Sequence, residues 1–129
     1  MRIKRDPLDI LFSHYIKQRD KVCQARIGLD GQPASEGELC GRSFGKLDAA
    51  HCFGRGRKSV RWDEENSCLL CFTHHQWYDH HDTEKRAFFR KRLGDKEFDL
   101  LEGRMRITWP KPDKVLLAIY YQNKLRGEG

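Results

Sequence analysis

Two kinds of side chain that bind metal ions, cysteine and histidine, recur along the chain, which has five cysteines and six histidines in 129 residues. Cys71 and His74 are separated by two residues, a spacing that lets one turn of the chain present both to the same ion. Cys23 and Cys40 can supply two further thiolates. Zinc in structural sites takes four such ligands in a tetrahedron. The sequence therefore predicts a structural Zn²⁺ site made of Cys23, Cys40, Cys71 and His74.

The choice of zinc ligands has an alternative within the same stretch. Cys68 and Cys71 are also separated by two residues, so Cys68 could replace His74. A cysteine left out of the set would be a small buried hydrophobe, and the same is expected of Cys52. A third possibility is a group of reduced core cysteines that bind no metal.

Histidine and asparagine occur around these cysteines in a particular order. The chain reads Leu-Asp-Ala-Ala-His51, then a basic loop rich in glycine, then Asn66, and then Cys-Phe-Thr-His-His75. This order resembles the HNH endonuclease family, as do the five-residue step from Asn66 to Cys71 and the cysteines upstream. The resemblance runs from about residue 23 to about residue 79. It implies a ββα-metal fold, in which a two-stranded ribbon and a helix hold one divalent ion. Because the family places its second zinc pair directly before the last catalytic histidine, the resemblance favours His74 over Cys68.

The resemblance implies a catalytic role for three residues. His51 matches the general base that deprotonates the attacking water, a role that suits the titration range of histidine. His75 matches a late ligand of a catalytic ion, Mg²⁺ or Mn²⁺, at the scissile phosphate. Asn66 matches the middle residue of the motif, which either orients the loop of the base or reaches the ion.

One position departs from the family pattern. The family commonly has Asp or His immediately before the general base, as a ligand of the catalytic ion, but this chain has Ala50. Asp48 lies two residues earlier on the expected strand. Asp79 lies four residues after His75 and would share its helix face. Either carboxylate is a candidate for the missing ligand.

The charge of the chain favours a polyanionic partner such as DNA. The formal net charge is +6 and the sequence pI is about 9.2, and basic proteins attract nucleic acid. Four cations, Arg55, Arg57, Lys58 and Arg61, lie in the loop between His51 and Asn66, where they are expected to hold phosphates. Charged residues make up 34% of the chain, so we expect a small core that a bound metal would help to stabilise.

The resemblance implies a metal-dependent DNA endonuclease that hydrolyses phosphodiester bonds, encoded by a phage or prophage. The segment at residues 11–20 is similar to the lead-in of phage DNA recombination nucleases of the NinG type. Two rival functions remain: a non-catalytic zinc module that binds nucleic acid, and a subunit of a phage DNA-processing assembly. A homodimer or a phage partner protein is possible in each case.

The composition also bears on location. No apolar run approaches the roughly 20 residues that a membrane-spanning helix needs, and the charged start leads into no apolar signal region. An odd number of cysteines without an export signal indicates reduced thiols rather than disulfides. These features favour the cytoplasm, that of the host if the protein is phage encoded.

We expect one α+β domain over residues 1–129, with an N-terminal arm and helix (1–22), a zinc and HNH core (23–81) and a C-terminal helical extension (82–129). Residues 1–5 are expected to be a loose basic arm, and residues 24–39 a loop. Helices are expected from Asp6-Pro7 to about residue 19, from residue 73, over 82–93 and 96–103, and after Asp113. Residues 104–109 are expected to be extended. The last helix either completes the core or offers Tyr120 and Tyr121 to a partner.

Overall fold

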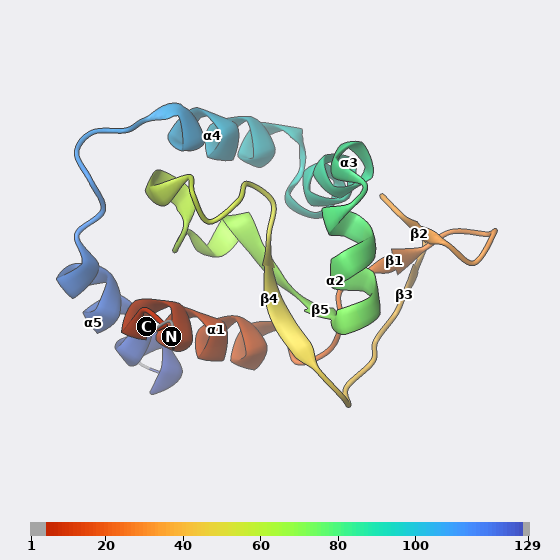
Figure 1. The fold of residues 1–129 in the computed structure, drawn as a ribbon, viewed down its shortest axis with the longest axis horizontal. Helices are drawn as coiled ribbons and strands as arrows, with labels where there is room; N and C mark the ends of the chain where they lie inside the picture. The colour runs from red at the N-terminus through yellow and green to blue at the C-terminus, as the bar shows by residue number, and fades with distance from the viewer. Residues whose placement is uncertain (1–4, 128–129) are drawn as a thin grey trace, which may run out of the picture.

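A computed structural model describes residues 5–127 and has the mixed α and β content that the sequence predicts (Figure 1). Residues 1–4, most of the predicted basic arm, lie outside the described residues. In chain order the elements are α1 (Pro7–Asp20), β1 (Arg26–Ile27), β2 (Pro33–Ala34), β3 (Glu38–Leu39), β4 (Leu47–His51), the 3-10 helices η1 (Lys58–Val60) and η2 (Glu64–Asn66), β5 (Ser67–Cys71), α2 (Phe72–Asp79), α3 (Asp82–Leu93), α4 (Asp95–Arg106) and α5 (Lys114–Leu125).

The first helix, α1, begins where its capping residues predict. The Asp6 carboxylate accepts a hydrogen bond from the Leu8 amide at 2.9 Å, and Pro7 occupies the first helical position, where its missing N–H costs nothing. Phe12 and Ile16 are buried on the face that packs inward. The helix ends at Lys21, whose φ of 68° is incompatible with further helix.

The centre of the molecule is an antiparallel ribbon of β4 and β5, followed directly by α2. Leu47 pairs with Cys71 and His51 pairs with Ser67. Side chains alternate between the two faces of a strand, so the ribbon contributes to two apolar clusters. Ala50 and Leu70 belong to the cluster that includes residues of α2, α3 and α4, whereas Leu69 belongs to the cluster with α1 and α5.

Residues 24–39 differ from the loop that the sequence predicts. Three two-residue strands form a small antiparallel sheet in the order β2-β1-β3. The Tyr78 hydroxyl, from α2, donates a hydrogen bond to the Ala34 carbonyl at 2.7 Å and so ties the sheet to the helix. Gly37 has a φ of +139°, and a Cβ there would lie 2.1 Å from the Ile27 carbonyl oxygen. Strands this short have no alternation for a sequence pattern to reveal.

The fourth helix is longer than the sequence predicts. α4 continues to Arg106, so the expected extended segment at 104–109 begins only after it. Arg104 explains part of the difference, because its Nε donates a hydrogen bond to the Asp63 carboxylate at 2.7 Å. Met105 also packs against the apolar cluster that includes Phe98 and Leu101. These tertiary contacts hold the last helical turn.

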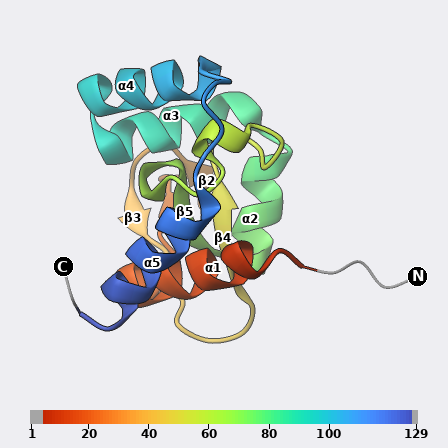
Figure 2. The same cartoon turned by 90° about the vertical axis from the view of Figure 1, so that its left-hand side faces the viewer.

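The final helix, α5, lies beside α1 (Figure 2). Tyr121 is buried between them, with its ring centroid 5.2 Å from that of Phe12 and 5.2 Å from that of Tyr15. Tyr120 is 41% exposed and its hydroxyl contacts the Glu64 carboxylate at 3.2 Å. The tail therefore completes the second apolar cluster through Tyr121 and leaves Tyr120 at the surface.

Candidate metal centre and neighbouring hollow

The four predicted zinc ligands lie together. Cys23 follows α1, Cys40 follows β3, Cys71 ends β5 and His74 lies in the first turn of α2. One potential ligand atom from each residue lies within 4.8 Å of the others. The Nδ1 atom of His74 is 3.3 Å from the Cys71 sulfur and 3.7 Å from the Cys23 sulfur. Side chains from four separate segments therefore converge at one point.

The donor set and its spacing fit zinc. Zinc bonds of about 2.3 Å to sulfur and 2.0 Å to nitrogen at tetrahedral angles place these atoms about 3.6 Å apart, close to the observed separations. Burial lowers the pKa of His74, which favours the neutral imidazole that a metal requires. Burial raises the pKa of the Cys23 thiol to about 12, so its thiolate needs a neighbouring cation. These four residues can hold a metal ion such as Zn²⁺.

Cys68 lies outside this group, as does Cys52. Cys68 is fully buried in the apolar cluster formed with α2 and α3, and it is paired in register with Ala50. Burial raises its pKa to about 12, as expected for an inert core thiol. Cys52 is 2% exposed and belongs to the same cluster. The structure therefore agrees with His74 rather than Cys68 as the fourth ligand.

Four further predicted site residues line a separate hollow of about 380 Å³. Asp48 and His51 come from β4, and His75 and Asp79 come from α2. Residues of α1, β4 and α2 all contribute to the lining of the hollow. Asp9, Arg55 and Lys85 also line it. The Lys85 amine lies 3.5 Å from the Asp79 carboxylate, and its side chain is only 12% exposed.

His51 is held in one tautomer. Its Nε2 lies 2.9 Å from the carbonyl oxygen of Arg61. A carbonyl oxygen only accepts hydrogen bonds, so Nε2 must carry the proton and Nδ1 keeps its lone pair. Burial lowers the pKa of His51, which keeps the ring neutral near pH 7. This side chain can accept a proton through Nδ1.

Asn66 is fully buried and organises the chain between β4 and β5. Its Nδ2 donates to the carbonyls of Phe53 at 2.9 Å and Val60 at 3.0 Å, and its Oδ1 accepts from the Phe53 amide at 2.9 Å. All of its strong hydrogen-bonding groups are thereby engaged. Of the two roles expected for Asn66, the contacts fit the one that orients the loop after His51.

His75 lies between the two candidate carboxylates. Its Nε2 is 3.2 Å from Asp79 and its Nδ1 is 3.8 Å from Asp48. Two ligands of one octahedral ion, each at about 2.1 Å, lie about 3 Å apart, so the pair formed by His75 and Asp79 has the spacing of shared ligands. Ala50, at the position where the family pattern has a ligand, is 1% exposed, packs in the core and does not line the hollow.

Two of the four predicted DNA-binding cations form ion pairs with a carboxylate of the protein that the sequence analysis did not identify. Asp9 is 7% exposed and forms ion pairs with Arg55 and Arg61. It also accepts a hydrogen bond from the Trp62 indole at 2.8 Å. Burial alone would raise the pKa of Asp9, but these hydrogen bonds lower it to about 2. In the sequence, this role of Asp9 is indicated by the position of an acidic residue beside the apolar stripe of the first helix.

The other two predicted cations, Arg57 and Lys58, are exposed, and no ion pair involves either one among residues 5–127. They are therefore available to an anionic partner. Arg55 is still 58% exposed in its side chain, whereas that of Arg61 is only 19% exposed. The side chain of Arg61 is thus paired with Asp9 inside the protein, and phosphate contacts by the four cations stay a prediction.

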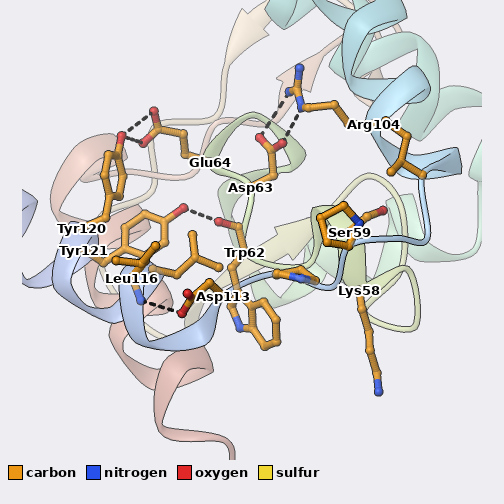
Figure 3. Close-up of a pocket in the computed structure, with 14 residues that line it drawn as sticks. Lys58, Ser59, Trp62, Asp63, Glu64, Arg104, Asp113, Leu116, Tyr120 and Tyr121 are labelled. Atoms are coloured by element: carbon orange, nitrogen blue, oxygen red, sulfur yellow. Dashed lines mark hydrogen bonds and ion pairs between the residues drawn. The ribbon is translucent and has the colours of Figure 1, made fainter.

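A larger hollow of about 650 Å³ lies elsewhere, between α5 and the 3-10 helices (Figure 3). Leu116, Tyr120 and Tyr121 lie together on one side of it, and Trp62 is also among its lining residues. Its acidic groups have partners within the chain: Glu64 with Tyr120, and Asp63 with Arg104. Its lining residues include no histidine or cysteine. The larger of the two hollows is therefore not the candidate metal or catalytic site.

The fold and these side chains define an α+β protein with a three-cysteine, one-histidine group able to hold a metal ion. Comparison with protein-family models, with curated proteins and with solved structures gives no match. None of the helices within residues 5–127 has the length and apolar character that crossing a membrane requires.

Proposed function

We propose that this protein is a metal-dependent endonuclease of the HNH type that hydrolyses phosphodiester bonds in DNA. One observation carries the proposal: a histidine with a free ring nitrogen and a histidine–carboxylate pair face the same hollow. The order of two antiparallel strands and a helix agrees with a ββα-metal core. The Cys3His group would brace that core with zinc.

His51 is the proposed general base. Since Nε2 donates to the Arg61 carbonyl, Nδ1 accepts the proton of the attacking water. The lowered pKa of His51 favours the neutral ring that this step requires. Arg61 acts only through its backbone, because its side chain is committed to Asp9.

His75 and Asp79 are the proposed ligands of a catalytic Mg²⁺ or Mn²⁺. The chemistry that such an ion supplies when bound is charge neutralisation on the scissile phosphate and stabilisation of the leaving oxygen. Asp79 takes the place of the ligand missing at Ala50. Asp48, on the Nδ1 side of His75, orients the imidazole, as carboxylates behind metal-binding histidines do.

Cations around the hollow would hold the substrate backbone. Arg55 and Lys85 line it, and Arg57 and Lys58 extend the basic surface along the same loop. The net charge of +6 supports attraction to a polyanion. These contacts would set affinity and register but would not read bases.

Cleavage of supercoiled plasmid tests the proposal. Wild-type protein loaded with zinc is incubated with Mg²⁺, with Mn²⁺ and without added divalent ion, beside His51→Ala and the control His14→Ala, which changes an exposed histidine. We expect metal-dependent nicking that His51→Ala reduces by at least about 100-fold, the lower range for loss of a general base, and that His14→Ala leaves unchanged. Equal nicking by both variants would contradict the assignment of His51.

The alternative function is a zinc module that binds nucleic acid without cutting it. Ala50 favours this alternative, because a buried methyl group occupies the position where the family commonly has a metal ligand. The two functions differ in their dependence on His51. The binding module would be a folded protein that retards DNA in a gel but cuts neither plasmid nor branched DNA. Its affinity for DNA would be unchanged by His51→Ala.

A further inference from the structure

Two phenylalanines at the surface contribute to neither apolar cluster. Phe44 is 71% exposed and Phe72 is 46% exposed, and neither is a member of the two clusters. Each ring carries a cation on one face: the Arg42 guanidinium is 5.3 Å from the Phe44 centroid, and the Lys46 amine is 5.3 Å from the Phe72 centroid. Single exposed apolar side chains are common, but two with the same cation arrangement on adjoining segments need an explanation.

Both phenylalanines lie close in sequence to predicted zinc ligands. Phe44 lies in the turn between Cys40 and β4, and Phe72 directly follows Cys71. The Phe72 amide donates a hydrogen bond to the Lys46 carbonyl at 3.0 Å, which joins the turn to the start of α2. The two rings are thus presented by a segment that the proposed zinc would hold rigid.

This segment adjoins the hollow that contains His51. Residues three, four and seven apart share one face of a helix, so Phe72 lies on the same face of α2 as His75 and Asp79. His75 is about 4.5 Å further along the helix axis, at a rise of 1.5 Å per residue. On the strand side, the Lys46 amine lies 4.0 Å from the Asp48 carboxylate, and Asp48 lines the hollow.

We propose that Phe44 and Phe72, with Arg42 and Lys46, form a stacking surface for unpaired nucleotides next to the scissile phosphate. This inference rests on the proposed nuclease function and assigns its substrate class: DNA with a single-stranded segment at the cleavage site. Bases in a duplex are stacked on one another and offer no free face, whereas unpaired bases stack on aromatic side chains. Both rings are solvent-exposed, and the cation beside each ring can contact the backbone phosphate.

Binding measurements without cleavage test the surface. The probes are a labelled oligothymidylate of about 12 nucleotides, within the span of common single-strand sites, and a duplex of equal length. Zinc-loaded protein is titrated by fluorescence anisotropy in buffer without Mg²⁺ or Mn²⁺. The variants are Phe44→Ala, Phe72→Ala, and the conservative changes Phe44→Tyr and Phe72→Tyr. Trp109→Ala is the matched control, because Trp109 is 76% exposed on the linker between α4 and α5, remote from the turn before β4 (Figure 1).

We expect each alanine variant to weaken oligothymidylate binding about fivefold or more, the lower range for one aromatic–base stack. Duplex binding should change less, and the tyrosine variants and Trp109→Ala should keep wild-type affinity for the oligothymidylate. Zinc content and circular dichroism of each variant show whether it is folded. Unchanged oligothymidylate binding in folded Phe44→Ala and Phe72→Ala would overturn the surface, as would an equal loss for the duplex.

The binding and cleavage measurements together distinguish a failure of this inference from a failure of the proposed nuclease function. Plasmid nicking together with binding that ignores both phenylalanines would overturn the stacking surface and leave the nuclease standing. Phenylalanine-dependent binding of oligothymidylate by a protein that cuts no DNA would support the surface and overturn the nuclease.

Discussion

Three consecutive carbonyl groups each accept a hydrogen bond from a side chain. The carbonyls of Val60, Arg61 and Trp62 accept from Asn66, His51 and Tyr121, respectively. A segment held at each residue loses little further freedom when a ligand binds, and buried polar groups are satisfied in the process. The proton position on His51 is therefore set by a carbonyl in a segment that is anchored at three successive residues, an arrangement that suits the proposed general base.

The depressed pKa of His51 predicts the pH dependence of cleavage. Because burial lowers the pKa below the ordinary value of 6.5, the neutral ring persists into mildly acidic solution. The same shift means that the unfolded chain binds a proton more readily, so the contribution of His51 to stability falls as pH falls through 6.5. We expect single-turnover cleavage to be level above pH 6.5 and to decline only below it. A cleavage rate that already falls above pH 6.5 as the solution is made more acidic would contradict a buried neutral base.

The zinc ligands can be told apart by paired cysteine variants. Cys71→Ser should lower bound zinc well below one ion per chain, because a neutral hydroxyl is a poor substitute for a thiolate. Cys68→Ser, a change of the same kind three residues away, should keep full zinc and lose only core stability. Elemental analysis of the purified variants measures both. Zinc lost from Cys68→Ser but kept in Cys71→Ser would reverse the assignment.

At the scale of elements, α1 contributes more than apolar packing. Asp9 reaches from α1 to Arg55, Arg61 and Trp62 on the chain between β4 and β5. The helix thus fixes the loop whose backbone orients His51. A segment outside the region of resemblance to HNH proteins supports the proposed site.

Loss of the Asp9 charge should destabilise the protein. Asp9→Asn leaves the poorly exposed guanidinium of Arg61 without its carboxylate, and breaking such a pair costs about 3 kcal/mol or more. The control Asp82→Asn removes only an exposed pair with Arg86 and should cost less than about 1 kcal/mol. Urea denaturation gives both free energies of unfolding. Equal values would mean that Asp9 contributes no more than a surface charge.

At the scale of the whole molecule, the chain has two modest apolar clusters on either side of one ribbon. The Cys3His group joins the end of α1, the small three-stranded sheet, the ribbon and α2. Metal binding at such a point contributes directly to folding free energy.

Removal of zinc should therefore unfold the chain. We expect a chelator to lower the melting temperature strongly or to abolish the cooperative transition, and re-addition of Zn²⁺ to restore it. Circular dichroism at rising temperature, with zinc content verified before and after, is the measurement. An unchanged melting curve in verified zinc-free protein would refute a zinc-stabilised core.

The salt dependence of DNA binding should report which cations are available. Arg57→Ala and Lys58→Ala should each reduce the slope of log affinity against log salt by about one, the loss of one phosphate contact. Arg61→Ala should leave the slope nearly unchanged and lower stability, because its side chain is paired with Asp9. A slope change for Arg61→Ala equal to that for Arg57→Ala would show that the pair opens on DNA.

Features that depend on local spacing and residue chemistry could be predicted from the amino-acid sequence. The cap at Asp6 and the start of the last helix at Asp113 follow from neighbouring residues. The two-stranded ribbon was expected only from the resemblance to HNH nucleases, and the structure gives its bounds. The metal-binding group was also predictable, because the two-residue gap between Cys71 and His74 suits a single turn and only a few further cysteines exist.

Features that depend on contacts between residues distant in the chain could not be predicted and became visible in the folded protein. The sheet over residues 26–39 is held by Tyr78, and the last turn of α4 by Arg104, so neither has a local signature. The ion pair between Asp9 and Arg61 joins residues 52 positions apart. Whether a charged side chain faces a carboxylate or solvent is set by long-range packing, which is why Arg61 could not be distinguished from Arg57 in the sequence.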